Sequence, residues 1–451
     1  MSAFGRPLRA VALLSTMALP LSAEALSSHV EAIAAIPPPD TAITTKFDVD
    51  GVTVILRRNP ANEVIAANLY LLGGARQLTP ANAGIEALLL LASERGTRRF
   101  PGATVRQRTA TLGSTIAVEA NDDWSAIGLH AIRATFDSTW AILADRVMSP
   151  TLSPGEVEIA REQMIAGARQ RATHPDDAAE QLADSLLYQQ HPYAIAATGT
   201  PASLASITIP QLRAYHTQQF VTSRMLLVVV GNVERAEVER LVRSTIATMP
   251  RGSYKWAPPP PTTSAGRALA IENRSIPTNY VLGYVPGPAA TSGDYVALRV
   301  ATAVLSGRLY TEVRSRRNLS YDVESQFIER AQGVGGLYVT TVDPNAVLRI
   351  MRHELSTLQN ETVDPEGLKR LEHQFITEYY LKNETNADQA NVLARAEVFA
   401  GDYRAADRFM EDLNRVTPED VRRVARQYLK DFRFAYVGDA SKLDRSLVSQ
   451  F

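Results

Sequence analysis

Alternating hydrophobic and polar positions predict β-strands early in the chain. Between Lys46 and Arg57, apolar and polar residues alternate around the turn-forming pair Asp50-Gly51, which predicts a β-hairpin. Apolar runs of strand length and apolar stripes of helical period follow. They predict a strand over 64–72, helices over 85–95 and 101–112, two strands within 114–131, and helices over 134–148 and 154–171. Strands grouped among longer helices, rather than in strict alternation, favour an α+β fold.

The same order of elements occurs twice. Three features recur in the same order. The first is a helix start with a capping residue, a proline and an acid, the second is a capped amphipathic helix, and the third is a short apolar strand that ends in glycine. The matched pairs are 152–156 with 363–367, 208–220 with 417–429, and 225–231 with 432–438. Each pair is roughly 210 residues apart, about half the chain.

We therefore predict two homologous domains in tandem, over 40–248 and 268–445, each with a mostly antiparallel or mixed sheet packed with helices. The segment 249–267 between them contains four consecutive prolines, Pro258 to Pro261. Such a run favours an extended, semi-rigid polyproline conformation, so this segment is interpreted as the linker.

The first 25 residues have the features of a secretory signal peptide. Arg6 and Arg9 precede an apolar run over 11–21, and Ala23-Glu24-Ala25 resembles a cleavage site. The run is too short to span a bilayer, and a buried N-terminal helix would not need the two arginines. The sequence thus predicts a soluble, periplasmic protein without a membrane span.

Composition excludes several chemistries. The chain has no cysteine, which removes disulfides, thiolate nucleophiles, iron–sulfur clusters and cysteine zinc sites. Its 47 basic and 48 acidic residues are balanced, which argues against an electrostatic nucleic-acid binder. None of the seven histidines has another histidine three or four positions away, so no local metal site is visible.

Three segments, in order, resemble the pitrilysin and insulysin type of metallopeptidase, to which the mitochondrial processing peptidase also belongs. They are GIEALLLLASERGT over 84–97, His191-Pro192-Tyr193 followed by Gly199-Thr200, and VRSRRNLSY over 313–321. Each match is weak alone, but their order and spacing extend over nearly the whole mature chain. From the residues themselves, His191 and Tyr193 are interpreted as structural anchors of a loop before the 208–220 helix.

The resemblance breaks at the zinc ligands. The family's inverted motif, H-x-x-E-H, places two histidines and a catalytic glutamate on one helix. The corresponding positions are Ala87, Leu90 and Leu91, and the third ligand, a glutamate in the family, falls near Ala168. Alanine and leucine have no lone pair for a metal, so this chain is expected to hold no zinc or other cofactor. Apolar core packing is the preferred interpretation of these positions.

The resemblance also implies a role for Arg314 and Tyr321. Bacterial relatives work as two-chain enzymes in which the zinc-free chain supplies an arginine and a tyrosine to its partner's active site, and these two residues match those positions. Both side chains can donate hydrogen bonds to a developing oxyanion or to a substrate backbone. Taken alone, the pair is ordinary: a basic helix end followed by a strand. Seven residues apart, they share a face if the helix continues, or a turn near Asn318 directs both to one place.

The sequence therefore favours the non-catalytic subunit of a periplasmic, heteromeric zinc metallopeptidase that hydrolyses peptides or unfolded segments. Its two domains would form half of a clam-shell, a homologous H-x-x-E-H chain carrying zinc would form the other half, and this chain alone would be inactive. The alternative is a non-enzymatic structural or scaffold protein built on the same fold. An autonomous enzyme with a relocated site stays open, although no group of residues supports it.

Overall fold

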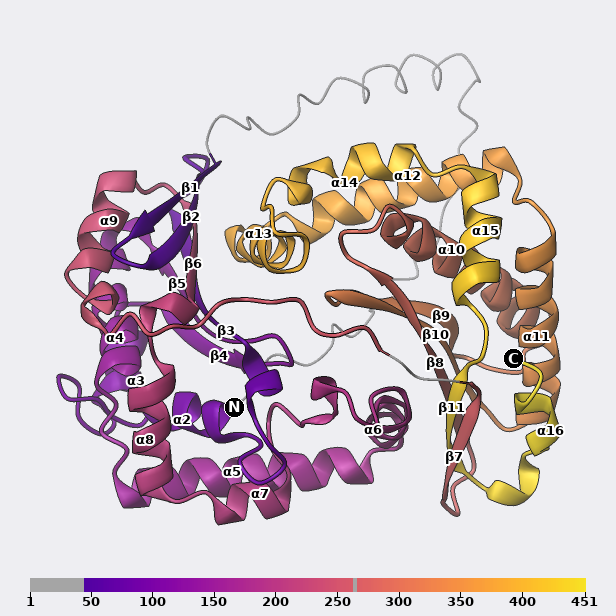
Figure 1. The fold of residues 1–451 in the computed structure, drawn as a ribbon, viewed down its shortest axis with the longest axis horizontal. Helices are drawn as coiled ribbons and strands as arrows, with labels where there is room; N and C mark the ends of the chain where they lie inside the picture. The colour runs from indigo at the N-terminus through magenta and orange to yellow at the C-terminus, as the bar shows by residue number, and fades with distance from the viewer. Residues whose placement is uncertain (1–43, 263–265) are drawn as a thin grey trace, which may run out of the picture. The chain divides into compact units, whose positions relative to one another are not determined.

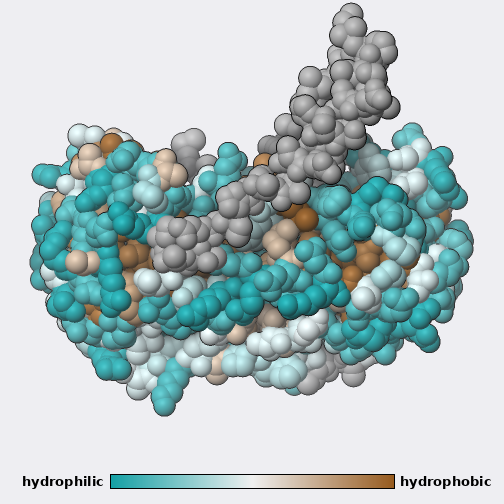
Figure 2. All heavy atoms as spheres, turned by 90° about the horizontal axis from the view of Figure 1, so that it is seen from above, coloured by the Kyte–Doolittle hydropathy of each residue, from teal (hydrophilic) through white to brown (hydrophobic). Residues whose placement is uncertain are grey.

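The computed structural model describes residues 44–262 and 266–451. The segment Thr44–Phe451 forms one compact unit, and the predicted signal peptide over 1–25 lies outside the described residues. None of the helices in the described ranges combines the length and the hydrophobicity needed to cross a bilayer. Hydrophilic side chains predominate on the face shown in Figure 2, with smaller hydrophobic areas between them.

The first sheet begins with the predicted hairpin. Asp50 and Gly51, both with positive φ (50° and 97°), form its turn, which suits the right-handed twist of paired strands. The sheet has six strands in the order β1-β2-β6-β3-β5-β4. They are β1 Thr44–Val49, β2 Val52–Arg58, β3 Val64–Leu72, β4 Thr115–Ala120, β5 Trp124–Ile132 and β6 Met225–Gly231. All neighbours are antiparallel except β2 and β6, which are parallel.

The second sheet repeats this topology. Its five strands, in the order β7-β11-β8-β10-β9, are β7 Ala268–Asn273, β8 Asn279–Ala289, β9 Val323–Ile328, β10 Gln332–Thr341 and β11 Arg433–Gly438. The pair β7 and β11 is parallel and the others are antiparallel, so the order matches β2-β6-β3-β5-β4 strand for strand. This confirms the predicted tandem α+β repeat, with β1 as an addition to the first copy.

The helices follow the repeat as well. In the first copy they are α2 Ile85–Ser93, α3 Thr104–Thr111, α4 Phe136–Met148, α5 Pro154–Thr173, α6 Pro175–Leu187, α7 Pro201–Ser206, α8 Ile209–Gln219 and α9 Arg235–Arg243. In the second copy they are α10 Asp294–Leu309, α11 Pro344–Asn360, α12 Pro365–Lys382, α13 Asn386–Ala400, α14 Ala405–Asn414, α15 Pro418–Tyr428 and α16 Arg445–Val448. The matched helices α8 and α15 both begin at a capping box, formed by Thr208 with Gln211 and by Thr417 with Asp420.

Glycine ends the central strand of each copy for the same steric reason. Gly231 and Gly438 have φ values of 150° and 154°. A Cβ at Gly231 would lie 2.9 Å from the Cα of Ile65, and one at Gly438 would lie 3.0 Å from the Cα of Asn279. The backbone of the neighbouring strand therefore excludes any side chain here.

One face of each sheet packs on helices of its own copy, and the other face packs on a helix of the other copy. Alternate residues of β6 divide between the two faces: Leu227 and Val229 join the core with α2, α4 and α8, whereas Leu226, Val228 and Val230 contact the buried Leu393 and Ala394 of α13. The continuous apolar run of β6 follows from this two-sided burial.

The second sheet is buried in the same way by α6. Phe434 and Tyr436 of β11 face their own helices, while Ala435 and Val437 pack with Ala179 and Ala183 of α6. Figure 1 shows α13 beside β3 and β6, and α6 beside the second sheet. The two copies thus exchange one helix each, so neither sheet is covered on both faces without the other copy.

This exchange predicts that the described unit unfolds as one. Leu393 of α13 is fully buried, and Leu393→Ala should lower the free energy of unfolding by about 2–5 kcal/mol through the cavity it leaves. All three tryptophans, Trp124, Trp140 and Trp256, precede the second sheet, and Trp124 packs on Phe399 of α13. Their fluorescence in urea therefore reports on the first copy, the linker and the docking of α13.

The fluorescence midpoint of Leu393→Ala should therefore fall although the substitution lies in the second copy. The control, Leu381→Ala on α12, removes a leucine that is 64% exposed and should change the midpoint little. An unchanged midpoint for Leu393→Ala would contradict the interdependence of the copies.

Candidate functional site

Helix α2 carries the positions that hold zinc in the resembling enzymes. It begins after Gly84, whose φ is 85° and whose Cβ, if present, would lie 2.7 Å from the Cα of Gly199. This close approach joins two of the segments on which the family resemblance rests. Because the helix start is fixed by that contact, the direction of Ala87, Leu90 and Leu91 is fixed as well.

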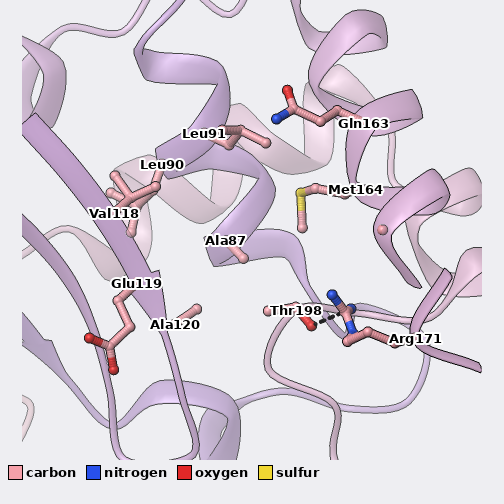
Figure 3. A pocket seen from close by; sticks show the side chains of 11 residues that line it. Ala87, Leu90, Leu91, Val118, Glu119, Ala120, Gln163, Met164, Arg171 and Thr198 are labelled. Carbon is pink, nitrogen blue, oxygen red and sulfur yellow. Dashed lines mark hydrogen bonds between the residues drawn. The ribbon is translucent and has the colours of Figure 1, made fainter. Parts of the chain in front are cut away.

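Ala87, Leu90 and Leu91 line one pocket of about 210 Å³ (Figure 3). The other walls come from β4, α5 and the loop that holds Thr198. Their lining residues are Val118, Glu119, Ala120, Gln163, Met164, Gly167, Arg171 and Thr198. Ala168 is not among them: it is buried, and the preceding Gly167 faces the pocket instead. The structure thus brings α2 and α5 together, and on α5 it is Gly167, next to Ala168, that lines the pocket.

The pocket offers no ligand set for a metal ion. Glu119 is the one carboxylate of its lining, and Arg171 donates from Nη2 to Thr198 Oγ1 at 3.0 Å, as Figure 3 shows. Across residues 44–262 and 266–451, no three or more His, Cys, Asp or Glu side chains are grouped so that they could hold a metal ion. A protein zinc site needs three or four such ligands. The residues present therefore do not fit zinc.

Glu86, the acid beside Ala87, is held in a buried ion pair. Its Oε2 accepts from Arg224 Nη1 at 2.9 Å and from Tyr215 Oη at 2.7 Å. Arg224 also donates from Nε to Leu72 O at 2.8 Å. Burial lowers the pKa of the Arg224 guanidinium, but the attraction of the Glu86 carboxylate raises it by more. The pKa of Arg224 is therefore above its usual value. This carboxylate therefore anchors α2 and is not available for catalysis.

Arg314 and Tyr321 lie side by side on the second copy. Helix α10 continues into a π-helix over Tyr310–Ser315, and Asn318, with φ of 51°, turns the chain toward β9. The Leu319 N–H donates to Val313 O at 3.0 Å across this turn. The second of the two geometries considered for the pair, a turn near Asn318, is the one observed.

The guanidinium of Arg314 lies close to two tyrosine rings. Its Cζ is 4.1 Å from the ring centroid of Tyr321 and 5.0 Å from that of Tyr310. Tyr321 is 78% exposed and Tyr310 47%. Among the side chains that the structure describes, none forms an ion pair with Arg314. We did not assign a role to Tyr310 from the sequence, although its place four residues before Arg314 on a helix indicates a contact.

His191 and Tyr193 have structural contacts. His191 Nδ1 accepts from the Tyr193 N–H at 3.1 Å, so its Nε2 carries the proton and donates to Pro260 O at 2.8 Å. Burial lowers the pKa of His191, which favours this neutral form. Tyr193 Oη donates to Asp123 Oδ2 at 2.8 Å. The pair therefore fastens the linker and the β4–β5 turn.

A cluster of charges joins the two copies beside this anchor. Arg330, between β9 and β10, places Nη2 3.5 Å from Asp122 Oδ2 and 3.6 Å from Asp184 Oδ2. Arg76 reaches Asp123 Oδ1 at 3.1 Å and donates to Ala257 O of the linker. Burial raises the pKa of Asp122 to about 7 even though Arg330 lowers it. No pattern in the sequence predicts this cluster, because its members come from four separate segments.

Comparison with known proteins identifies the domain type. Residues 206–375 match the model described as the peptidase M16 inactive domain. Over this stretch the chain is thus similar to the inactive domain of M16 peptidases. An uncharacterized zinc protease of Mycobacterium leprae is 23% identical over 389 residues, which is 84% of this chain and 87% of the relative. The mitochondrial-processing peptidase subunit beta of Blastocladiella emersonii is 21% identical, with 86% of each chain covered.

Solved structures share the fold. A peptidase M16 inactive domain from Pseudomonas fluorescens superposes with a TM-score of 0.80 at 20% identity, covering 88% of this chain and 98% of its own. A chain of Complex III2 from Candida albicans gives a TM-score of 0.78 at 15% identity, with 90% and 99% covered. The predicted M16-type resemblance and the α+β fold are confirmed.

The buried pair of this M16 fold makes a stability prediction. Arg224→Ala leaves the carboxylate of Glu86 buried without its cation and should lower the free energy of unfolding by about 3–5 kcal/mol. The double variant with Glu86→Leu should recover part of that loss, because no charge then stays buried.

Urea unfolding measures both effects. The control, Arg235→Ala, breaks an exposed pair with Glu239 and should cost less than about 1 kcal/mol. Equal losses for Arg224→Ala and Arg235→Ala would show that the buried pair does not anchor α2.

The charge cluster makes a prediction about pH. Because the folded-state pKa of Asp122 is raised from 3.8 to about 7, folding binds a proton, and the associated stability is present below pH 4 and is lost as the pH rises to 7. Each tenfold change in proton affinity corresponds to about 1.4 kcal/mol. Since 22% of the Asp122 side chain reaches solvent, the effect should be smaller than full burial would give.

Asp122→Asn mimics the protonated form and should remove this loss. The free energy of unfolding that the variant gains over the unmodified chain should be larger at pH 8 than at pH 5. Urea unfolding at both pH values measures this gain. Glu411→Gln, at a carboxylate that is 65% exposed on α14, serves as the control and should show no such difference. A pH-independent effect of Asp122→Asn would overturn this interpretation.

Proposed function

We propose that this chain is the zinc-free subunit of a periplasmic, heteromeric zinc metallopeptidase, and that Arg314 and Tyr321 contact the peptide at the active site of a homologous H-x-x-E-H partner. The observation that carries the proposal is the position of Arg314: a half-buried arginine close to two exposed tyrosine rings, with no ion-pair partner in the described ranges. The apolar residues at the ligand positions of α2 support it, because an enzyme of this type would then need its metal from another chain.

The geometry suits recognition of a peptide carbonyl. Rings stacked on the faces of a guanidinium leave its N–H groups pointing outward in its plane, where they can donate to an acceptor. Tyr310 and Tyr321 also restrict the rotamers of Arg314, so little side-chain freedom is lost when a substrate binds. The Tyr321 hydroxyl is a second donor, and two fixed donors can stabilise an oxygen that gains negative charge during hydrolysis.

The predicted domains, 40–248 and 268–445, would act together with the two domains of the partner. The partner's zinc would supply the activated water, and no residue of this chain would handle that step. Peptides and unfolded segments are the proposed substrates, because an active site enclosed between two chains admits extended polypeptide. The predicted signal peptide over 1–25 is the basis for the periplasmic location.

A scaffold role is the second candidate. A cytochrome b-c1 complex subunit 1 from Homo sapiens is 22% identical over 51% of this chain and 49% of its own, and the Complex III2 chain shares the fold. Those names describe a subunit of a respiratory complex. In such a role Arg314 and Tyr321 would be ordinary surface residues, so their substitution separates the two candidates.

In the reconstituted two-chain enzyme, Arg314→Ala should lower kcat/KM by about 10²–10³, the usual loss when one fixed donor to an oxyanion is removed. Tyr321→Phe tests the hydroxyl alone and should lower kcat/KM while keeping the stacking. The measurement is cleavage of a fluorogenic peptide at saturating partner concentration.

Arg316→Ala is the matched control. Arg316 belongs to the same helix end, is 67% exposed and bonds with Glu312, so its loss should change kcat/KM by less than about twofold. Unchanged cleavage with both Arg314→Ala and Tyr321→Phe would refute the active-site role and favour the scaffold.

A further inference from the structure

The pocket between α2, β4 and α5 has a chemistry of its own. Figure 3 shows Ala87, Leu91 and Met164 in its middle, with the labelled polar side chains around the edge. Most of its lining is aliphatic: Ala87, Leu90, Leu91, Val118, Ala120 and Met164. An open apolar pocket of this kind lacks the contacts that a filled one would have, so an apolar occupant gains free energy by entering it.

The polar groups at the edge already have protein partners. Arg171 donates to Thr198 Oγ1, the Gln163 amide oxygen accepts from Arg95 Nη2 at 3.3 Å, and Glu119 Oε1 accepts from Asn121 Nδ2 at 3.1 Å. One polar group of each of these side chains is therefore already satisfied within the protein. The lining therefore selects for an apolar group.

The size of the pocket limits the occupant. Its volume of about 210 Å³ lies below the 300–1,000 Å³ that is typical of sites for small-molecule ligands, and suits one large side chain. Its wall includes Val118, Glu119 and Ala120 of β4, the last strand of the first sheet, which pairs with β5 alone among the strands of the described ranges. The outer backbone groups of β4 are thus available to an extended segment that passes the pocket.

We propose that this pocket binds a single large aliphatic or aromatic side chain of an extended polypeptide. As the source of that polypeptide we take the peptide substrate, and in this respect the inference rests on the proposed function. The place that would hold a metal ion in an active homologue then selects substrate segments by one apolar residue. This chain would contribute to specificity as well as to the contacts made by Arg314.

Gly167 provides a variant that fills the pocket without unfolding the chain. A Cβ at Gly167 meets one neighbour within 4 Å, Arg171 Nη1 at 3.7 Å, so a side chain has room there. Leucine also favours a helix more than glycine does, so Gly167→Leu should not lower the melting temperature. Gly155→Leu makes the same change near the start of α5, where a Cβ meets nothing within 4 Å.

The test uses the full chain alone and fluorescein-labelled peptides of the form Thr-Lys-Thr-X-Thr-Lys-Thr, in which X is Leu, Phe, Ala or Asp. Fluorescence anisotropy should give a Kd at least tenfold lower for the Leu and Phe peptides than for the Ala and Asp peptides. Gly167→Leu should abolish this preference and leave the Ala peptide unaffected. Gly155→Leu should keep the preference.

Equal affinity for the Leu and Ala peptides, or an unchanged preference in Gly167→Leu, would overturn the inference. Because no zinc-bearing partner is present, these outcomes are independent of the Arg314 experiment. A failed preference together with a cleavage defect in Arg314→Ala would refute the pocket and leave the proposed function standing. A clear preference for the Leu and Phe peptides, with no cleavage defect in Arg314→Ala, would support the pocket and refute the active-site role of Arg314.

Discussion

The exchange of α6 and α13 between the two copies is the constraint on which the rest of the structure depends. Each sheet has an apolar face that its own copy leaves open, and the helix that covers it comes from the other copy. A single copy would expose a face that includes Leu226, Val228 and Val230 to water. The duplication therefore created a mutual dependence as well as a longer chain.

The exchange also positions the two candidate sites. Helix α5 lines the apolar pocket and runs into α6, so the pocket wall is tied to the second sheet. The cluster of Arg330 with Asp122 and Asp184, and the contacts of His191 with the linker, connect the copies at the same place. Arg314 lies at the end of α10, which packs on that second sheet. Both sites thus sit on elements that the exchange holds in place.

Much of the fold could be predicted from periodicity and repeats. The strand over 64–72 was found with its observed bounds, and the matched helix starts at Thr208 and Thr417 both carry the expected caps. The exchange could not be predicted, because an apolar stripe on a helix does not identify the sheet that it covers. The helix expected over 101–112 begins three residues late, at Thr104.

The sites were predictable to different degrees. The three α2 positions that the resemblance compares with zinc ligands all line the pocket, whereas on α5 Gly167 lines it and Ala168, about 100° further around the helix, does not. The stacking of Arg314 on Tyr310 and Tyr321 depends on a π-helix and on the left-handed conformation of Asn318, neither of which has a reliable sequence signal.

The central claim is that the surface around Arg314 and Tyr321 faces a homologous zinc-bearing chain. Photocrosslinking in the native host tests it most directly, with p-benzoylphenylalanine in place of Tyr321 and, as a control, in place of Tyr380, a tyrosine on α12 that is 44% exposed. The account predicts a crosslink from position 321, and not from 380, to a chain that carries H-x-x-E-H. Crosslinks to no such chain, or equal crosslinks from both positions, would contradict it.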